Sequence, residues 1–507
     1  MSAPVPRSLA DQLRSWPDER LRTLLVARPD LATPAPQDSG QLASRAATRA
    51  SVMRAVDQLD RCTLTVLEAL GVLGGRAATT DVERIVRAAP DAVRTSLRQA
   101  LDLALVWGEE DDLRLVSAVA DTLATTVTRL GPSLSSLLEG AGPRRVAALL
   151  AGAGGRSSGD RETDLGQLGA LLRDPEHVEG LLATCDEAAR AMLLHLEESG
   201  VDGRSDAADH EVDVAGARTP VEQLLARGLL MPRDRRHLAV PREVAIALRG
   251  GRTTRDSVDV PPEVATSPRQ TSLVDRAAAG AAYELVHRVE LVLDHWSEEP
   301  PGVLRQGGLA VRDGRALATL LHADDATTAL VLDVALAAGL VARGAARGAP
   351  DAWLPTDTFD AWRAAPLETR WAQLADAWLT SPRLVGLVGR RRDGRTVNPL
   401  APDIDVAWAV DVRRATLQVL AELPAGATLA PGTGVASLVA RLHWLRPRRP
   451  ASRDEAVGWT LLEAAVLGVT GLGGMTAHGR ALLDSGPEAA ARAVAALLPA
   501  PVDHVLL

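Results

Sequence analysis

The chain repeats one arrangement of apolar and polar positions: a stretch with helical spacing, then two short apolar runs around a polar turn. The clearest copy covers 227–248, where apolar runs at 228–231 and 237–240 flank a charged turn at 232–236. Two apolar runs split by a short charged turn predict a β-hairpin. Pro241 then suits the first position of a following helix.

Two further segments, 103–123 and 339–362, repeat this order. A helical pattern precedes each hairpin; the first has its turn at 108–112, and the other has a longer, Gly-rich turn. A helix-rich unit closed by a hairpin is the winged-helix version of the helix-turn-helix. The sequence therefore predicts a mainly α fold with short β-hairpins, organised as tandem winged-helix-like units.

Pro-rich and polar breaks between the periodic stretches predict the domain boundaries. The expected regions are 1–59, an N-terminal helical segment; 60–138, the first winged-helix-like unit; 139–164, a linker with a short helix; 165–250, the second unit; 251–271, a linker; 272–365, the third unit; and 366–507, a C-terminal helical region with a possible fourth unit.

Composition changes how the basic residues must be interpreted. The 507 residues include no lysine, so all 56 basic residues are arginine, and the net charge is −9. The overall field therefore repels a polyanion, and binding of DNA or RNA would need a local basic patch. The two cysteines, Cys62 and Cys185, are expected to be buried apolar residues rather than a disulfide.

Three local basic clusters are the candidates for nucleic-acid contact, because arginine forks suit phosphate groups. The first is interleaved with Trp444, the second lies in a GRRRDGR stretch, and the third is the expected tip of the second hairpin. The candidate residues are Arg441, His443, Arg446, Arg448, Arg449 and Arg453; Arg390, Arg391, Arg392 and Arg395; and Arg233, Arg235 and Arg236. The alternative is that they are solvated turns in an arginine-rich chain.

Catalytic chemistry has little support in the sequence. The Gly-rich stretch 152–159 follows no strand pattern and has no lysine, so a flexible loop is expected there rather than a phosphate-binding loop. The histidines are scattered, and Asp403, Asp405 and Asp411 are expected to form a turn and a solvated face rather than a cation site. We therefore expect a protein without enzymatic activity, metal or cofactor.

Targeting and membrane signals are also missing from the sequence. The first residues lack the apolar core of a signal peptide. No uninterrupted apolar run reaches the roughly 18 residues of a membrane span, so a soluble cytoplasmic protein is the expectation. The last apolar positions, Val502 and 505–507, are expected to begin a strand.

Three stretches carry a resemblance to a known family: LASRAATRASVMRAVDQLDRCTLTVLEAL, VARLHWLRPRR and the closing LLPAPVDHVLL. With them, the chain resembles actinobacterial helicase-associated domain proteins, whose members generally continue into a domain similar to the N-terminal region of XPB-type helicases. The resemblance implies a DNA-related setting and a longer protein of which this chain is the N-terminal part, or a truncated product. It supplies no catalytic residues.

Two functions follow from these observations as hypotheses. The first is a DNA-associated protein of tandem winged-helix units that binds DNA, a repair or transcription partner, or both. The second is a protein–protein interaction scaffold without direct DNA contact, which fits the acidic balance. A continuous basic face would favour the first, and arginines paired with Asp and Glu would favour the second.

Overall fold

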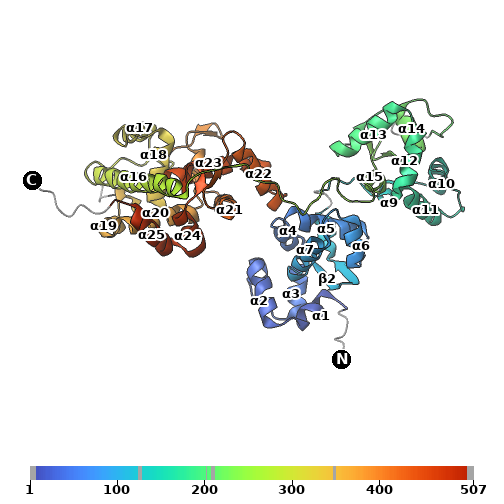
Figure 1. Cartoon of the computed structure of the whole chain (residues 1–507), viewed down its shortest axis with the longest axis horizontal. Coiled ribbons are helices and arrows are strands. Elements are labelled where there is room, and N and C mark those ends of the chain that lie inside the picture. Colours follow the sequence, from blue (N-terminus) through green and yellow to red (C-terminus); the bar gives the residue numbers. More distant parts are fainter. Residues whose placement is uncertain (1–6, 124–127, 201, 207–211, 346–349, 500–507) are drawn as a thin grey trace, which may run out of the picture. The chain divides into compact units, whose positions relative to one another are not determined.

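The computed structural model describes residues 7–123, 128–200, 202–206, 212–345 and 350–499. Helices account for 58% of the chain and strands for 9%, so the predicted mainly α class with small sheets is confirmed. The chain divides into two compact units, Met1–Pro261 with Leu445–Arg448, and Pro262–Trp444 with Arg449–Leu507 (Figure 1). The expected strand start at 502–507 lies outside the described residues.

The first unit begins with four short helices, each following a helix-breaking or capping residue. They are α1 (Leu9–Ser15), α2 (Asp18–Ala27), α3 (Ser39–Ala46) and α4 (Arg49–Val56). The side chains of Ser8, Asp38 and Thr48 accept hydrogen bonds from backbone N–H groups of the first turns of α1, α3 and α4. Buried leucines of these helices join the core of the following elements.

The order helix, strand, two helices, two strands then appears for the first time. The elements are α5 (Arg61–Val72), β1 (Arg76–Ala77), α6 (Thr79–Ile85), α7 (Pro90–Asp102), β2 (Val106–Glu109), β3 (Asp112–Leu115) and α8 (Ser117–Thr122). The three strands form an antiparallel sheet in which the third strand lies between the first and the second. The predicted hairpin at 103–123 is therefore confirmed as β2 and β3.

A second group of elements follows, with a core of its own. It comprises α9 (Leu134–Leu137), α10 (Pro143–Gly152), α11 (Arg161–Arg173), α12 (Pro175–Ala183), α13 (Glu187–Ser199), β4 (Gly203–Arg204), α14 (Pro220–Ala226), β5 (Met231–Pro232), β6 (His237–Ala239) and α15 (Arg242–Leu248). Its sheet again places the last strand between the other two. The hairpin predicted at 227–248 is present, with shorter strands than expected.

The linker predicted at 139–164 requires a correction. It contains α10 and the start of α11, which pack against each other, and Leu149 and Leu150 of α10 are buried. Gly152 lies so close to α14 that a Cβ atom there would be 1.9 Å from the carbonyl oxygen of Ala226. The small, Gly-rich residues suggested a flexible connection, but here they allow close packing.

The second unit contains the third copy of the element order. It includes α16 (Thr271–Glu298), α17 (Val311–Leu320), α18 (Asp325–Ala337), β8 (Val341–Gly344), β9 (Ala352–Pro355), α19 (Asp357–Ala364) and α20 (Leu367–Thr380). A single bridge from Gly302 to Ala352 adds an edge to the β8–β9 hairpin, on the β9 side. Part of the Gly-rich turn predicted in this hairpin, 346–349, lies outside the described residues.

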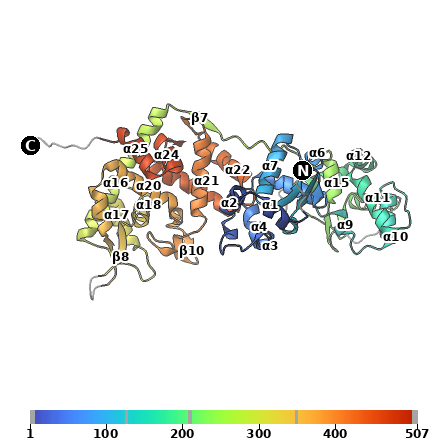
Figure 2. The same ribbon diagram turned by 90° about the horizontal axis from the view of Figure 1, so that it is seen from below.

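A fourth copy of the order completes the second unit. After β10 (Arg391–Arg392) and β11 (Arg395–Thr396) come α21 (Ala409–Glu422), β12 (Ala427–Leu429), α22 (Gly434–Leu445), α23 (Asp454–Val466), β13 (Thr470–Gly471), β14 (Gly474–Met475), α24 (Ala477–Ser485) and α25 (Pro487–Val494). Within this unit α20, α24 and α25 pack together, and both views show them grouped (Figure 1 and Figure 2).

The predicted linker at 251–271 is also corrected at both of its ends. Val258 is buried in the core of the first unit, and the Thr253 N–H donates to the Ile85 carbonyl at 2.8 Å. Farther along, β7 (Thr266–Pro268) pairs with β12 and forms one edge of the fourth sheet, whose order is β13-β14-β12-β7. Prolines and polar residues in this stretch therefore form an extended segment bound at both ends.

Five of the ten tryptophans are buried in the second unit: Trp296, Trp353, Trp362, Trp371 and Trp378. Trp296, Trp371 and Trp378 are almost wholly buried. The indole N–H of Trp371 donates to the Leu467 carbonyl at 2.7 Å, and that of Trp378 donates to the Glu463 carboxylate at 2.7 Å. These bonds satisfy polar atoms that would otherwise be costly to bury.

Candidate nucleic-acid interface

One of the three predicted clusters lies on a separate hairpin, β10–β11, and all of its arginines are exposed. Its turn residues, Asp393 and Gly394, both have positive φ, 49° and 79°, which is the backbone of a tight two-residue hairpin turn. The register places Arg392 directly opposite Arg395. Two like charges facing each other across a hairpin destabilise it, so an anion placed between them would relieve this repulsion.

The guanidinium groups of this hairpin have only neutral partners at three of the four positions. Arg391 donates to the Gly394 carbonyl at 3.0 Å, Arg392 to the Asp403 carbonyl at 3.0 Å, and Arg395 to the Gln306 side chain at 3.1 Å. All three are exposed. Among the residues that the structure describes, no carboxylate lies within ion-pair distance of these three groups, which leaves their positive charges uncompensated.

Arg390 differs from its three neighbours. Its guanidinium lies 2.9 Å from the Glu455 carboxylate and stacks on the Trp459 ring, with its carbon 4.8 Å from the ring centre. Its charge is therefore already paired, and its side chain helps to cover α23. The predicted cluster at 390–395 reduces to Arg391, Arg392 and Arg395.

A cleft of about 760 Å³ opens beside this hairpin. Arg392 and Arg395 line it together with Arg305, an exposed residue of the loop before α17. Arg305 was not predicted, because a single arginine in an arginine-rich chain gives no sequence signal. Asp403 and Asp405 also line the cleft, and Asp405 is paired with Arg383 at 3.0 Å.

The cluster at 441–453 is mostly paired with acidic side chains. His443 and Arg449 both contact the Asp454 carboxylate, at 2.9 Å and 2.6 Å. Arg441 lies 3.5 Å from Glu422. Arg441 and Arg449 therefore form ion pairs within the second unit, and His443 shares the Asp454 carboxylate with Arg449, so these groups do not form an open phosphate-binding surface.

The remaining residues of that stretch have separate surroundings. Arg448 belongs to the first unit, where its Nε lies 2.7 Å from the Asp57 carboxylate. Arg453 stacks on Trp408, with its guanidinium carbon 5.0 Å from the ring centre. Arg446 is half-buried. The six predicted residues are therefore divided between the two units.

The third cluster is exposed at the turn between β5 and β6. Arg233 lies 2.5 Å from the Asp202 carboxylate, and Asp234 accepts a hydrogen bond from the His237 ring at 2.8 Å. Arg235 and Arg236 extend from the same turn and are exposed. The corresponding turn between β2 and β3 contains Glu110 and Asp111 instead, so a basic hairpin tip is not a shared feature of the copies.

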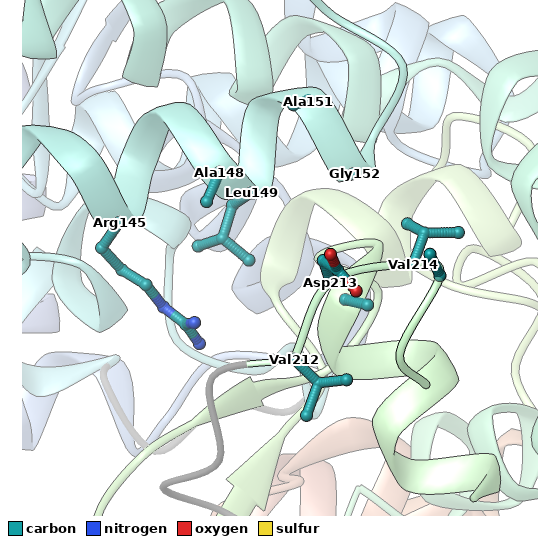
Figure 3. A pocket seen from close by; sticks show the side chains of 10 residues that line it. Arg145, Ala148, Leu149, Ala151, Gly152, Val212, Asp213 and Val214 are labelled. Atoms are coloured by element: carbon teal, nitrogen blue, oxygen red, sulfur yellow. The ribbon is translucent and has the colours of Figure 1, made fainter. Parts of the chain in front are cut away.

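The described part of the chain offers no candidate metal site. Its histidines, cysteines and acidic residues form no group of three that could hold a metal ion. A cavity of about 520 Å³ beside α10 is lined by small and aliphatic side chains, with Arg145 and Asp213 on different walls (Figure 3). The residues described along it include no serine, threonine, cysteine or histidine. Over the same described ranges, no helix has the length and apolarity needed to cross a bilayer.

The comparisons with known proteins leave the family open. No family model, no curated protein and no solved structure matches the chain.

Proposed function

We propose that the chain is a non-enzymatic, DNA-associated protein built of four winged-helix units. The recurring element order supports this proposal: in each copy two strands follow the helices, and the last strand lies in the middle of the small sheet. In the third copy a single β-bridge stands in for the first strand. In the second copy one described helix, α14, stands where the others have two.

In helix-turn-helix proteins the recognition helix enters the major groove. The last helix before the hairpin in each unit, which would occupy that position, is a poor candidate for a DNA-reading helix here. α14, α18 and α23 contain no arginine or histidine. Arg94 of α7 is paired with Glu83 at 2.9 Å. α14, α18 and α23 therefore lack the basic side chains that bind phosphates or read guanine edges. α7 also contains Arg98, which is exposed and donates to the Thr95 hydroxyl at 3.1 Å.

The observation that carries the proposal is the β10–β11 hairpin. Arg391, Arg392 and Arg395 are exposed, have no carboxylate partner within the described residues, and include one pair facing each other across the strands. A phosphate backbone would compensate all three charges. The expected contact is to phosphates, and so it is independent of base sequence.

The test is fluorescence anisotropy with labelled duplex, forked and single-stranded DNA. Changing Arg391, Arg392 and Arg395 together to alanine should weaken binding at least tenfold. A control changes Arg22, Arg84 and Arg190 to alanine, because these are exposed arginines already paired with Glu19, Asp81 and Glu179. It alters the net charge equally and should weaken binding less than twofold.

Two results would overturn the proposal. If the unaltered protein shows no salt-sensitive binding to any of the three DNA forms, direct DNA contact is wrong. If both triple variants lose affinity equally, the contact is not on the hairpin.

A second candidate function is a protein–protein scaffold. It is favoured by the pairing of Arg233, Arg390, Arg441, Arg448 and Arg449 with acidic side chains. Arginines compensated within the chain contribute little to the attraction of a polyanion. The partner in that case would be a repair or transcription protein, and the hairpin variant would leave its binding unchanged.

A further inference from the structure

An apolar groove of about 520 Å³ lies in the second unit, between the start of α18, the segment 385–389 and α23. Its lining is mainly apolar, and Leu330 and Val385 form its buried floor. Leu462 of α23 extends beside them with 70% of its surface exposed. An exposed leucine next to a buried apolar floor suits contact with another apolar group.

Two residues of the groove wall, Gly386 and Trp459, lie directly against each other. A Cβ atom on Gly386 would be 2.1 Å from the indole ring, so only glycine lets the segment approach so closely. The Arg390 side chain also stacks on the Trp459 ring and is paired with Glu455. The indole is therefore fixed as a rigid wall of the groove.

The charges around the groove are acidic. Asp324 and Asp325 are exposed at the start of α18 and line one end. Asp324 caps the helix by accepting the Thr327 N–H at 2.7 Å, whereas Asp325 is in the first turn and open to solvent. Glu463 lies in the lining as well, but it is buried and accepts the Trp378 indole N–H, and burial raises the pKa of its carboxyl group, so the charge of the rim comes from the two aspartates. Only a partner with positive charge complements this rim.

We propose that this groove docks an amphipathic peptide segment of a partner protein, with apolar side chains against Leu330, Trp459 and Leu462 and an arginine or lysine beside Asp325. The apolar floor provides the contact area, and the aspartates select the charge and orientation of the segment. The inference does not rest on DNA binding, because Arg391, Arg392 and Arg395 are not among the residues that line the groove.

The test starts from a displayed library of random 16-residue peptides selected against the full chain. Selected peptides should carry apolar residues at a helical spacing and a positive net charge. Synthetic copies are then measured by fluorescence anisotropy against four variants. Leu462→Gln and Asp325→Arg should each weaken binding at least tenfold.

Two matched controls keep the test decisive. Leu194→Gln changes an exposed leucine in α13, a helix of the same length as α23. Asp357→Arg changes the first residue of α19, as Asp325 is the first of α18. Both controls should change affinity less than twofold. The proposal is wrong if no peptide is enriched, if the enriched peptides are acidic, or if binding survives the two groove variants.

Discussion

At the scale of single residues, several charged side chains of the second unit are buried in its core, among them Asp333, Arg383 and Arg413. Asp333 is almost completely enclosed, and its carboxylate accepts a hydrogen bond from the Arg383 Nε at 2.8 Å. Arg413 is buried too, and donates to the carbonyls of Ser381 and Arg383 at 2.8 Å and 2.9 Å. Removing one member of such a network leaves an uncompensated group in the core.

The titration of Asp333 gives a pH-dependent prediction. Burial raises the pKa of its carboxyl group from 3.8 to about 6, against the attraction of Arg383. A raised pKa in the folded state favours the protonated form, so this group stabilises the fold below pH 3.8 and loses that contribution as the pH rises through 6. The loss amounts to about 3 kcal/mol.

The measurement compares urea unfolding of the second unit in the unaltered protein and in Asp333→Asn from pH 4 to pH 7. The stability of the unaltered protein, relative to the variant, should fall across this range by up to about 3 kcal/mol. A difference that grows with pH would show instead that the attraction of Arg383 outweighs burial.

At the scale of elements, two glycines distinguish a helix packed tightly against its neighbour from a helix with open space beside it. In α10, a Cβ on Gly152 would be 1.9 Å from a backbone oxygen of α14, whereas Gly166 inside α11 has nothing within 4 Å of its Cβ position. Gly152→Ala should destabilise the first unit by about 2 kcal/mol or more through overpacking. Gly166→Ala should stabilise it by about 0.5–1 kcal/mol, because alanine favours helix.

Thermal unfolding of the two variants checks this prediction. The opposite signs of the two shifts are the decisive result. If Gly152→Ala leaves the melting temperature unchanged, then 139–164 behaves as the flexible linker that its composition suggests.

Periodicity predicted the elements well and their connections poorly. Leu64, Leu67 and Leu70 repeat at helical spacing, which indicates a helix, and they lie in α5, where all residues from 62 to 70 are buried. By contrast, the pairing of β7 with β12 joins residues more than 150 positions apart. Nothing local in Thr266–Pro268 indicates that partner, so the sequence suggested a linker.

The candidate site was only partly predictable for a related reason. Arg391 and Arg449 look alike in the sequence, since each lies in a run of arginines. The structure separates them: Arg449 contacts Asp454 at 2.6 Å, whereas Arg391 contacts only a carbonyl. Compensation of charge depends on which acidic residue folds nearby, and that information is not in a short motif.

At the scale of the whole molecule, the net charge of −9 sets the background against which any DNA contact works. Long-range attraction of a polyanion is excluded by this charge, so an interface must act through short-range contacts. Three uncompensated guanidinium groups on one hairpin are few compared with the contacts of a protein that carries a continuous basic face. The affinity for DNA should therefore be modest.

This count predicts the salt dependence of binding. Each neutralised phosphate of duplex DNA contributes about −0.9 to the slope of log K against log salt. Three contacts from Arg391, Arg392 and Arg395 give a slope of about −2.7, and a fourth from Arg305 gives about −3.6. Anisotropy titrations from about 50 mM to 200 mM salt measure this slope directly. The triple alanine variant should lose about 2.7 from its magnitude. A slope of about −6 or steeper would mean that arginines paired in this structure open on binding, and would move the interface beyond the hairpin.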